Sequence, residues 1–311
     1  MHNILILGGD GFIGKNILSY IDQVNFFKNH KKFMTFSKKS LSSDYVPVNS
    51  MVSNIKLEQV DAIKNLIKEN NINTIVHLVS GMIPSSNEKD FEEEKRTVIA
   101  PTNEIFSFAA ENGVKVIFIS SGGTIYENNL EDHKENEDLN PINFYGMSKV
   151  AIEKILKDLQ INSNLRYITL RPSNVYGNFY SLNSNQGLIP NTINNILKKE
   201  PITIWGDGSA RRDYLFAEDL AKTVYQMILK KDVCGEFNVA SSSVHSVLEV
   251  IKLIESKINI PANIMFKDSR DVDVSCNTLD TSKIKKIIEF KPHNLDYGLN
   301  KIIKNIPIKN E

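Results

Sequence analysis

The sequence has little cysteine, no long apolar run and no excess of either charge. Its two cysteines, Cys234 and Cys276, are too few and too far apart for a metal cluster or a disulfide framework, which predicts a reducing, cytoplasmic environment. The apolar run near the N-terminus, residues 4–7, is much shorter than the core of a signal peptide or a membrane span. Lys and Arg total 37, as do Asp and Glu, and no basic block stands out. We therefore expect neither a nucleic-acid nor a membrane partner.

Through the first half of the chain, short β-rich runs alternate with segments of helical period. Such alternation predicts right-handed βαβ units, and therefore a Rossmann-type, doubly wound α/β fold built on a parallel sheet. The expected strands are residues 4–7, 33–36, 74–78, 114–120 and 167–170, and the expected helices are residues 13–21, 57–70, 98–112 and 145–159.

The length of 311 residues exceeds that of a typical single domain. In the second half, loops rich in Pro, Gly and Asn break the alternation around a helix and strand at residues 188–205. We predict a dinucleotide-binding domain of residues 1–172, to which residues 216–246 return. A smaller C-terminal α/β substrate domain is expected from residues 173–215 and 247–311.

A glycine-rich turn joins the first expected strand to the first expected helix. Gly8, Gly11 and Gly14 have the spacing G-x-x-G-x-x-G, and Phe12 and Ile13 begin the helix. Residues without a Cβ let the backbone approach a pyrophosphate, and the helix N-terminus offers N–H groups to the anion. The turn therefore predicts a dinucleotide site at these five residues, the alternative being a plain strand-to-helix turn.

The end of the second expected strand bears on the choice of cofactor. An acidic residue there would bind the adenosine ribose, but the chain has Ser37, Lys38 and Lys39. A hydroxyl and two ammonium groups suit a 2′-phosphate, although two solvated surface lysines would give the same pattern. We expect NAD or NADP, and these residues make NADP plausible.

A tyrosine and a lysine, Tyr145 and Lys149, stand four residues apart on an expected helix and so share a face. The spacing alone proves little, because Tyr297 and Lys301 repeat it in the tail. Tyr145 is the better candidate because it follows the expected strand at residues 114–120. The alternative is a core or interface tyrosine beside a lysine.

The turn after that strand supplies two hydroxyls, Ser121 and Thr124. Hydride removal from a carbinol requires a base for the hydroxyl proton, and Tyr145 can act as one if its pKa falls towards neutrality. The ammonium of Lys149 and an oxidised nicotinamide would both lower that pKa, while Ser121 or Thr124 holds the substrate oxygen.

Four further segments follow one another along the chain in the order expected for one protein family. They are VHLVS at residues 76–80, SSGGTIY at 120–126, LRPSNVYG at 170–177 and WGDGSARRDY at 205–214. With the glycine turn and the Tyr–Lys pair, they resemble the extended short-chain dehydrogenases. The resemblance is to the nucleotide-sugar epimerase/dehydratase family, which includes the uridine-diphosphate-glucose 4-epimerases, and it runs over nearly the full length.

The resemblance implies roles for individual residues. Tyr145 would be the acid/base, Lys149 would orient the nicotinamide ribose, and Thr124 or a neighbour would hold the reacting oxygen. Further cofactor contacts are implied at Leu78, Ser80, Ser120 and Pro172. Asn174, Arg212 and Arg270 would reach the nucleotide diphosphate, for which guanidinium groups are suited. For Arg270, a surface ion pair is the alternative.

The chain also departs from the family. Gly122 stands where many epimerases carry a catalytic serine, which leaves the choice between Ser121 and Thr124 open. Thr97 replaces a usual asparagine, and Glu127 replaces a glycine. We expect the contacts to the cofactor to differ accordingly.

Three functions remain open. The first expectation is a UDP-hexose 4-epimerase, and the alternative is a reductase that uses a reduced cofactor on a 4-keto-6-deoxy sugar nucleotide. A non-catalytic dinucleotide sensor is the third. A 4,6-dehydratase is disfavoured because residues 122–125, at the turn around Thr124, supply no Asp–Glu pair. The family habit of dimerising through two helices per subunit suggests a homodimer interface at residues 98–112 and 145–159.

Overall fold

The computed structural model describes residues 2–24, 31–35, 50–127, 132–179, 187–268 and 278–306. Its centre is a seven-stranded sheet of order β11-β7-β5-β4-β1-β2-β3, in which every neighbouring pair is parallel. The strands are β1 Asn3–Leu7, β2 Lys31–Thr35, β3 Ser50–Ser53, β4 Thr74–His77, β5 Lys115–Ile119, β7 Tyr167–Pro172 and β11 Gly235–Val239. The predicted doubly wound α/β fold is confirmed, although β3 was not expected from the sequence.

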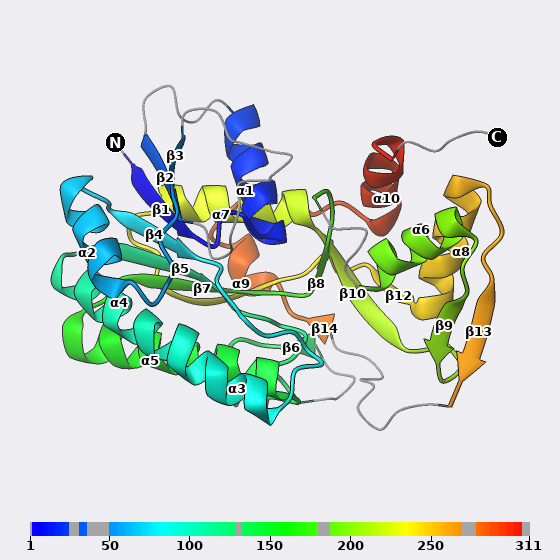
Figure 1. The fold of residues 1–311 in the computed structure, drawn as a ribbon, viewed down its shortest axis with the longest axis horizontal. Coiled ribbons are helices and arrows are strands. Elements are labelled where there is room, and N and C mark those ends of the chain that lie inside the picture. Colours follow the sequence, from blue (N-terminus) through cyan, green and yellow to red (C-terminus); the bar gives the residue numbers. More distant parts are fainter. Residues whose placement is uncertain are drawn as a thin grey trace.

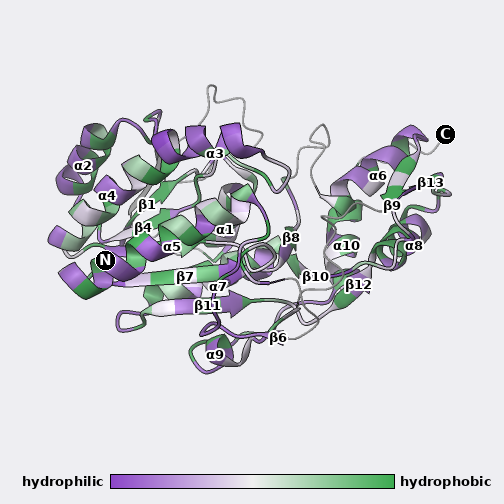
Figure 2. Ribbon diagram, turned by 90° about the horizontal axis from the view of Figure 1, so that it is seen from below, coloured by the Kyte–Doolittle hydropathy of each residue, from purple (hydrophilic) through white to green (hydrophobic). Residues whose placement is uncertain are grey.

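Helices cover both faces of this sheet (Figure 1). The strand residues alternate between the faces: Ile4 and Ile6 pack with α1 and α7, whereas Leu5 and Leu7 pack on the other side. Because both faces are covered, β1 and β5 have unbroken apolar runs at residues 4–7 and 116–119, and Figure 2 shows this apolar interior beneath hydrophilic outer helix surfaces. The helices are α1 Phe12–Gln23 and α7 Ala217–Leu229 on one face, and α2 Val60–Glu69, α4 Ala100–Glu111 and α5 Phe144–Ser163 on the other.

The helix expected at residues 98–112 is preceded by a further helical segment. Helix α3, Glu88–Glu94, begins with a capping box at Asn87 and continues through a π-helical turn, Lys95–Ile99, into α4. Such a turn inserts an extra residue into the helical repeat and changes which side chains face inward. It lies where α3 packs along the start of α5, with the rings of Phe91 and Phe144 5.8 Å apart.

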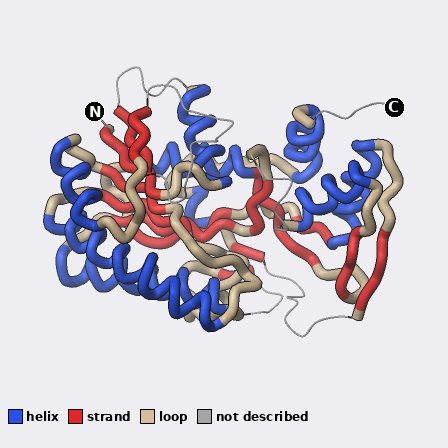
Figure 3. The backbone as a smooth tube through the Cα atoms, viewed as in Figure 1, coloured by secondary structure: helices blue, strands red, loops and turns tan. Residues whose placement is uncertain are grey.

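A smaller group of elements lies beside the large sheet (Figure 3). A second core joins α6 Leu188–Lys198, β9 Ile202–Trp205, α8 Val247–Ile258 and α10 Leu295–Lys304, and β9 pairs with β13 Ile264–Lys267. The strands β8 Asn174–Tyr176, β10 Arg211–Phe216 and β12 Val244–Ser246 form a three-stranded sheet between this group and the large sheet.

The remaining elements pack near the edge of the large sheet. A short parallel pair is formed by β6 Asp132–His133 and β14 Thr278–Leu279, and α9 is Ser282–Lys285. Ile284 of α9 is buried in the core beneath α7, so this part of the tail lies against the large sheet rather than with α8 and α10. Among the described residues, no helix combines the length and apolarity needed to cross a bilayer.

Candidate active site

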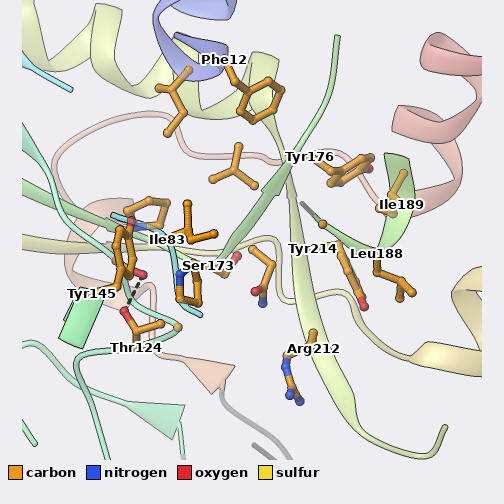
Figure 4. Close-up of a pocket in the computed structure, with 18 of the residues that line it drawn as sticks. Phe12, Ile83, Thr124, Tyr145, Ser173, Tyr176, Leu188, Ile189, Arg212 and Tyr214 are labelled. Carbon is orange, nitrogen blue, oxygen red and sulfur yellow. Dashed lines mark hydrogen bonds between the residues drawn. The ribbon is translucent and has the colours of Figure 1, made fainter. Parts of the chain in front are cut away.

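A cavity of about 620 Å³ opens beyond the carboxyl ends of the parallel strands, between the large sheet and the smaller group of elements (Figure 4). This is where ligands bind in open α/β sheets. Many of the predicted site residues line it: Phe12, Ile13, Ser120, Ser121, Thr124, Tyr145, Pro172, Asn174 and Arg212.

Tyr145 occupies the first turn of α5. The helix is capped by Asn143, whose side chain accepts a hydrogen bond of 2.8 Å from the Gly146 N–H. Ser121 lies close enough to the Tyr145 hydroxyl to lower its pKa by hydrogen bonding, and Thr124 donates to the Ser121 Oγ at 3.0 Å. The structure thus brings both candidate hydroxyls to the predicted acid/base, at the same end of the cavity (Figure 4).

Lys149 lies one turn further along α5, beneath Tyr145. Its Nζ is 5.4 Å from the centroid of the Tyr145 ring and donates to the Ile119 carbonyl at 3.4 Å. The Lys149 side chain is buried and does not line the cavity. Its ammonium therefore approaches the Tyr145 ring from the protein interior.

The protein's own groups keep Tyr145 protonated. Burial raises the pKa of Tyr145 to about 12, the hydrogen bond with Ser121 opposes that rise, and the charge of Glu94 adds to it. Burial lowers the pKa of Lys149 to about 8, although the negative charges of Glu94 and Glu153 act to raise it. The expected lowering of the tyrosine pKa is therefore not found in the protein by itself, because desolvation outweighs the hydrogen bond with Ser121.

The glycine turn fits the pyrophosphate of a dinucleotide. Gly8 has a φ of +81°, which favours glycine, and a Cβ on Gly14 would lie 2.6 Å from the Gly9 Cα. Gly11 is the N-cap of α1 and provides no side-chain cap. Helix α1 can therefore pack closely against the turn. Its first two residues, Phe12 and Ile13, line the cavity, so its N-terminal backbone N–H groups lie near the cavity.

Two predicted cofactor residues, Leu78 and Ser80, do not line the cavity. Leu78 packs against the core beneath α1, and the Ser80 hydroxyl donates to Glu94 at 3.2 Å. Ser37, Lys38, Lys39 and Arg270 lie outside the described residues.

The far end of the cavity carries the polar groups predicted for a diphosphate. Asn174 in β8 donates its Nδ2 hydrogen to the Asp213 carbonyl at 3.1 Å, and Arg212 in β10 is partly exposed at the cavity rim. Figure 4 places Arg212 and Tyr214 across the cavity from Tyr145. Polar side chains thus lie at both ends of the cavity.

Sequence reasoning missed several parts of the site, among them the start of α6, where Leu188, Ile189 and Pro190 line the cavity. Met82, Ile83 and Pro84, in the loop after β4, form an apolar portion of the cavity wall. Glu94 is 2% exposed, although it ends the run Glu92–Glu93–Glu94 that reads as a solvated helix face. The recurrence of Phe91, Glu94 and Val98, all buried, is the signal that could have identified it.

The second Tyr–Lys pair lies elsewhere. Tyr297 packs against Phe216 and His293 in the smaller core, and the Lys301 Nζ lies 5.6 Å from its ring. Neither residue lines the cavity. The same spacing therefore gives a packing pair in α10, whereas in α5 it gives a tyrosine that lines the cavity and a buried lysine.

Comparison with known proteins identifies this architecture. The model of the NAD dependent epimerase/dehydratase family matches residues 4–240. The dTDP-4-dehydro-6-deoxyglucose reductase of Escherichia coli is 30% identical over 99% of this chain and 98% of its own length. A putative UDP-glucose 4-epimerase of Methanocaldococcus jannaschii is 26% identical over 96% of this chain and 97% of its own.

Solved structures agree in fold. The UDP-glucose 4-epimerase of Thermotoga maritima superposes with a TM-score of 0.89 at 24% identity, covering 97% of each chain. The UDP-glucose 4-epimerase of Thermus thermophilus, in complex with NAD, gives a TM-score of 0.86 at 20% identity, covering 98% of this chain and 100% of its own. The predictions of the family, of an enzyme and of a nicotinamide dinucleotide cofactor are confirmed.

Proposed function

The chain belongs to the NAD-dependent epimerase/dehydratase family, and from this premise we propose that it reduces the C4 carbonyl of a 4-keto-6-deoxy sugar nucleotide. The observation that carries the proposal is the Tyr145 hydroxyl at the cavity wall, linked to Ser121 and Thr124 and held as a phenol by burial. A reductase needs a group that donates a proton to the oxygen at C4, and a phenol with a pKa of about 12 holds that proton at neutral pH.

The residues act as follows. When bound, a reduced nicotinamide dinucleotide supplies the hydride. Ser121 and Thr124 hydrogen-bond the C4 oxygen, and Tyr145 gives that oxygen its proton, so the carbonyl becomes a hydroxyl and the phenol becomes a phenolate. The ammonium of Lys149 stabilises the phenolate until solvent returns the proton. Asn174 and Arg212 bind the diphosphate and thereby hold the sugar in place.

The apolar wall supports a deoxygenated sugar. Met82, Ile83 and Pro84 line the same cavity as Tyr145. An apolar surface suits a C6 methyl group better than a C6 hydroxyl, and the hydroxyl of this part of the wall is that of Ser85. The E. coli relative, named as a reductase of dTDP-4-dehydro-6-deoxyglucose, supports the same substrate class.

A 4-epimerase is the second candidate, favoured by the fold likeness to the T. maritima enzyme. One acid/base and one cofactor serve both directions of hydride transfer, so the site is compatible with a reaction that takes the hydride and returns it. Tyr145 would then have to lose its proton first, which its burial opposes.

Two incubations separate the candidates. With a uridine or thymidine 4-keto-6-deoxyhexose nucleotide and NADH or NADPH, we expect one reduced cofactor to be oxidised per sugar, monitored by the loss of dinucleotide absorbance. With UDP-glucose and no added cofactor, we expect no C4 epimer by chromatography. Epimer formation without keto-sugar reduction would reject the reductase in favour of the epimerase.

The preference between NAD and NADP remains a prediction, as do a cytoplasmic location and a homodimer through α4 and α5. The division into a dinucleotide-binding part, residues 1–172 and 216–246, and a substrate part is likewise proposed.

A further inference from the structure

Glu94 is a buried carboxylate at the junction of α3 and the π-helical turn. Its Oε2 accepts a hydrogen bond from the Gly81 N–H at 2.9 Å. Its Oε1 accepts from Ser80 at 3.2 Å and from Ser148 at 3.3 Å. Glu94 thus joins the loop after β4 to α5, and Ser148 directly precedes Lys149.

The hydrogen-bond partners of Glu94 are neutral, unlike those of the neighbouring buried carboxylate. Glu153 is bound by the Arg171 guanidinium at 2.6 Å, which neutralises its charge. Among the hydrogen bonds of the described residues, Glu94 receives none from a cation. A buried charge requires compensation, and for Glu94 the cation that provides it is Lys149, on which the carboxylate acts electrostatically.

Among the described residues, the groups that act on the Tyr145–Lys149 pair come from α5, α3, β4 and the turn after β5. Glu153 lies on α5 itself, Glu94 comes from α3, His77 from β4, and Ser121 from the turn after β5. Burial and the charge of Lys149 lower the pKa of His77 to about 3, so His77 is neutral. Glu94 is therefore the carboxylate near the pair whose charge no arginine cancels.

Building on the proposed function, we infer that Glu94 is a positioning residue whose negative charge keeps the pair in its proton-donating form, a phenol at Tyr145 and an ammonium at Lys149. The carboxylate does not touch the substrate. It stabilises the cation of Lys149 and opposes the phenolate of Tyr145, so that after each turnover it favours the return of a proton to the tyrosine. Its effect on both pKa values has this sign.

Glu94→Gln isolates the charge. The glutamine oxygen can accept from the Gly81 N–H, and its amide can donate to the Ser80 and Ser148 hydroxyls, so all three hydrogen bonds can be kept. The matched control is Glu93→Gln, which removes the same charge from the adjacent residue, where Glu93 is exposed and paired with Arg96 at 2.6 Å.

Two readouts are needed. The first is the pH dependence of keto-sugar reduction, and the second is the alkaline absorbance titration of Tyr145, obtained as the difference between each protein and its Tyr145→Phe derivative. In Glu94→Gln we expect both transitions to move to lower pH by on the order of one unit. Glu93→Gln should match the wild type, and Glu94→Asp, which keeps the charge, should restore most of the profile.

Several outcomes would overturn the inference. One is a Glu94→Gln protein that is slower or less heat-stable but has an unchanged pH profile, because that indicates a structural role. Another is an equal shift in Glu93→Gln, which indicates a general charge effect. Should the glutamine variant fail to fold, Glu94→Met removes the same charge and must give the same shift. A wild type that reduces no keto sugar rejects the proposed function, whereas the tyrosine titration still tests Glu94.

Discussion

Arg171 and Glu153 form a fully buried ion pair, with the Arg171 Nη2 2.6 Å from the Glu153 Oε2. The pair links the end of β7 to α5. Glu153 also accepts a hydrogen bond of 2.6 Å from the hydroxyl of Ser120, which lines the cavity. The Glu153 carboxylate therefore binds both the buried Arg171 and Ser120 of the cavity wall.

Arg171→Met should destabilise the protein by about 3–5 kcal/mol, because it leaves the Glu153 charge buried without a partner. Chemical denaturation measures the loss. The double variant Arg171→Met/Glu153→Leu should recover part of it, since both charges are then gone. A single variant within about 1 kcal/mol of the wild type would contradict this account of the pair.

Tyr145→Phe should lower the rate of hydride transfer by at least about 100-fold, because the proton donor is removed while the ring stays. Binding of dinucleotide, followed by fluorescence, should be retained. Tyr297→Phe is the matched control, since Tyr297 has the same Lys spacing but packs in the smaller core. If the two variants behave alike, Tyr145 is not the acid/base.

The rate of keto-sugar reduction should fall as the pH rises through about 8. Lys149 carries its charge below its pKa of about 8 and loses it above, whereas Tyr145, with a pKa of about 12, keeps its proton over this range. Activity is thus present on the acidic side of the transition and lost on the alkaline side. The initial rate, measured with saturating substrate at a series of pH values, tests this. A rate that increases above pH 8 would show that these protonation states of Lys149 and Tyr145 are wrong.

Gly14→Ala should abolish dinucleotide binding. The added Cβ would lie 2.6 Å from the Gly9 Cα and 2.6 Å from the Gly9 carbonyl oxygen, so α1 must move away from the turn. Binding is measured by the thermal shift that the dinucleotide produces. Gly113→Ala is the control: the space around it is open but its φ is +65°, so it should cost about 1 kcal/mol of stability and leave binding intact. Binding that survives in Gly14→Ala would remove the turn from the cofactor site.

The fold class and the ends of the cavity could be predicted because they rest on local signals. The alternation of strands with helices, the glycine turn and the four-residue spacing of Tyr145 and Lys149 each reflect backbone preference or periodicity over a few residues. Strand β3 and helix α3 were missed because they are short, and α3 is so hydrophilic that its one buried face is hard to see in the sequence.

The sequence by itself thus determined the parallel α/β scaffold and the family resemblance, and it made Tyr145 and Lys149 the preferred candidates over Tyr297 and Lys301. Only the tertiary structure decided that Tyr145 lines a cavity while Tyr297 packs in the smaller core, that Glu94 is buried while Glu93 is exposed, and that burial holds Tyr145 as a phenol. The physical reason is that burial and electrostatic coupling depend on residues far apart in the chain. Glu94 meets Ser148 only because α3 packs on α5, a contact that no local pattern encodes.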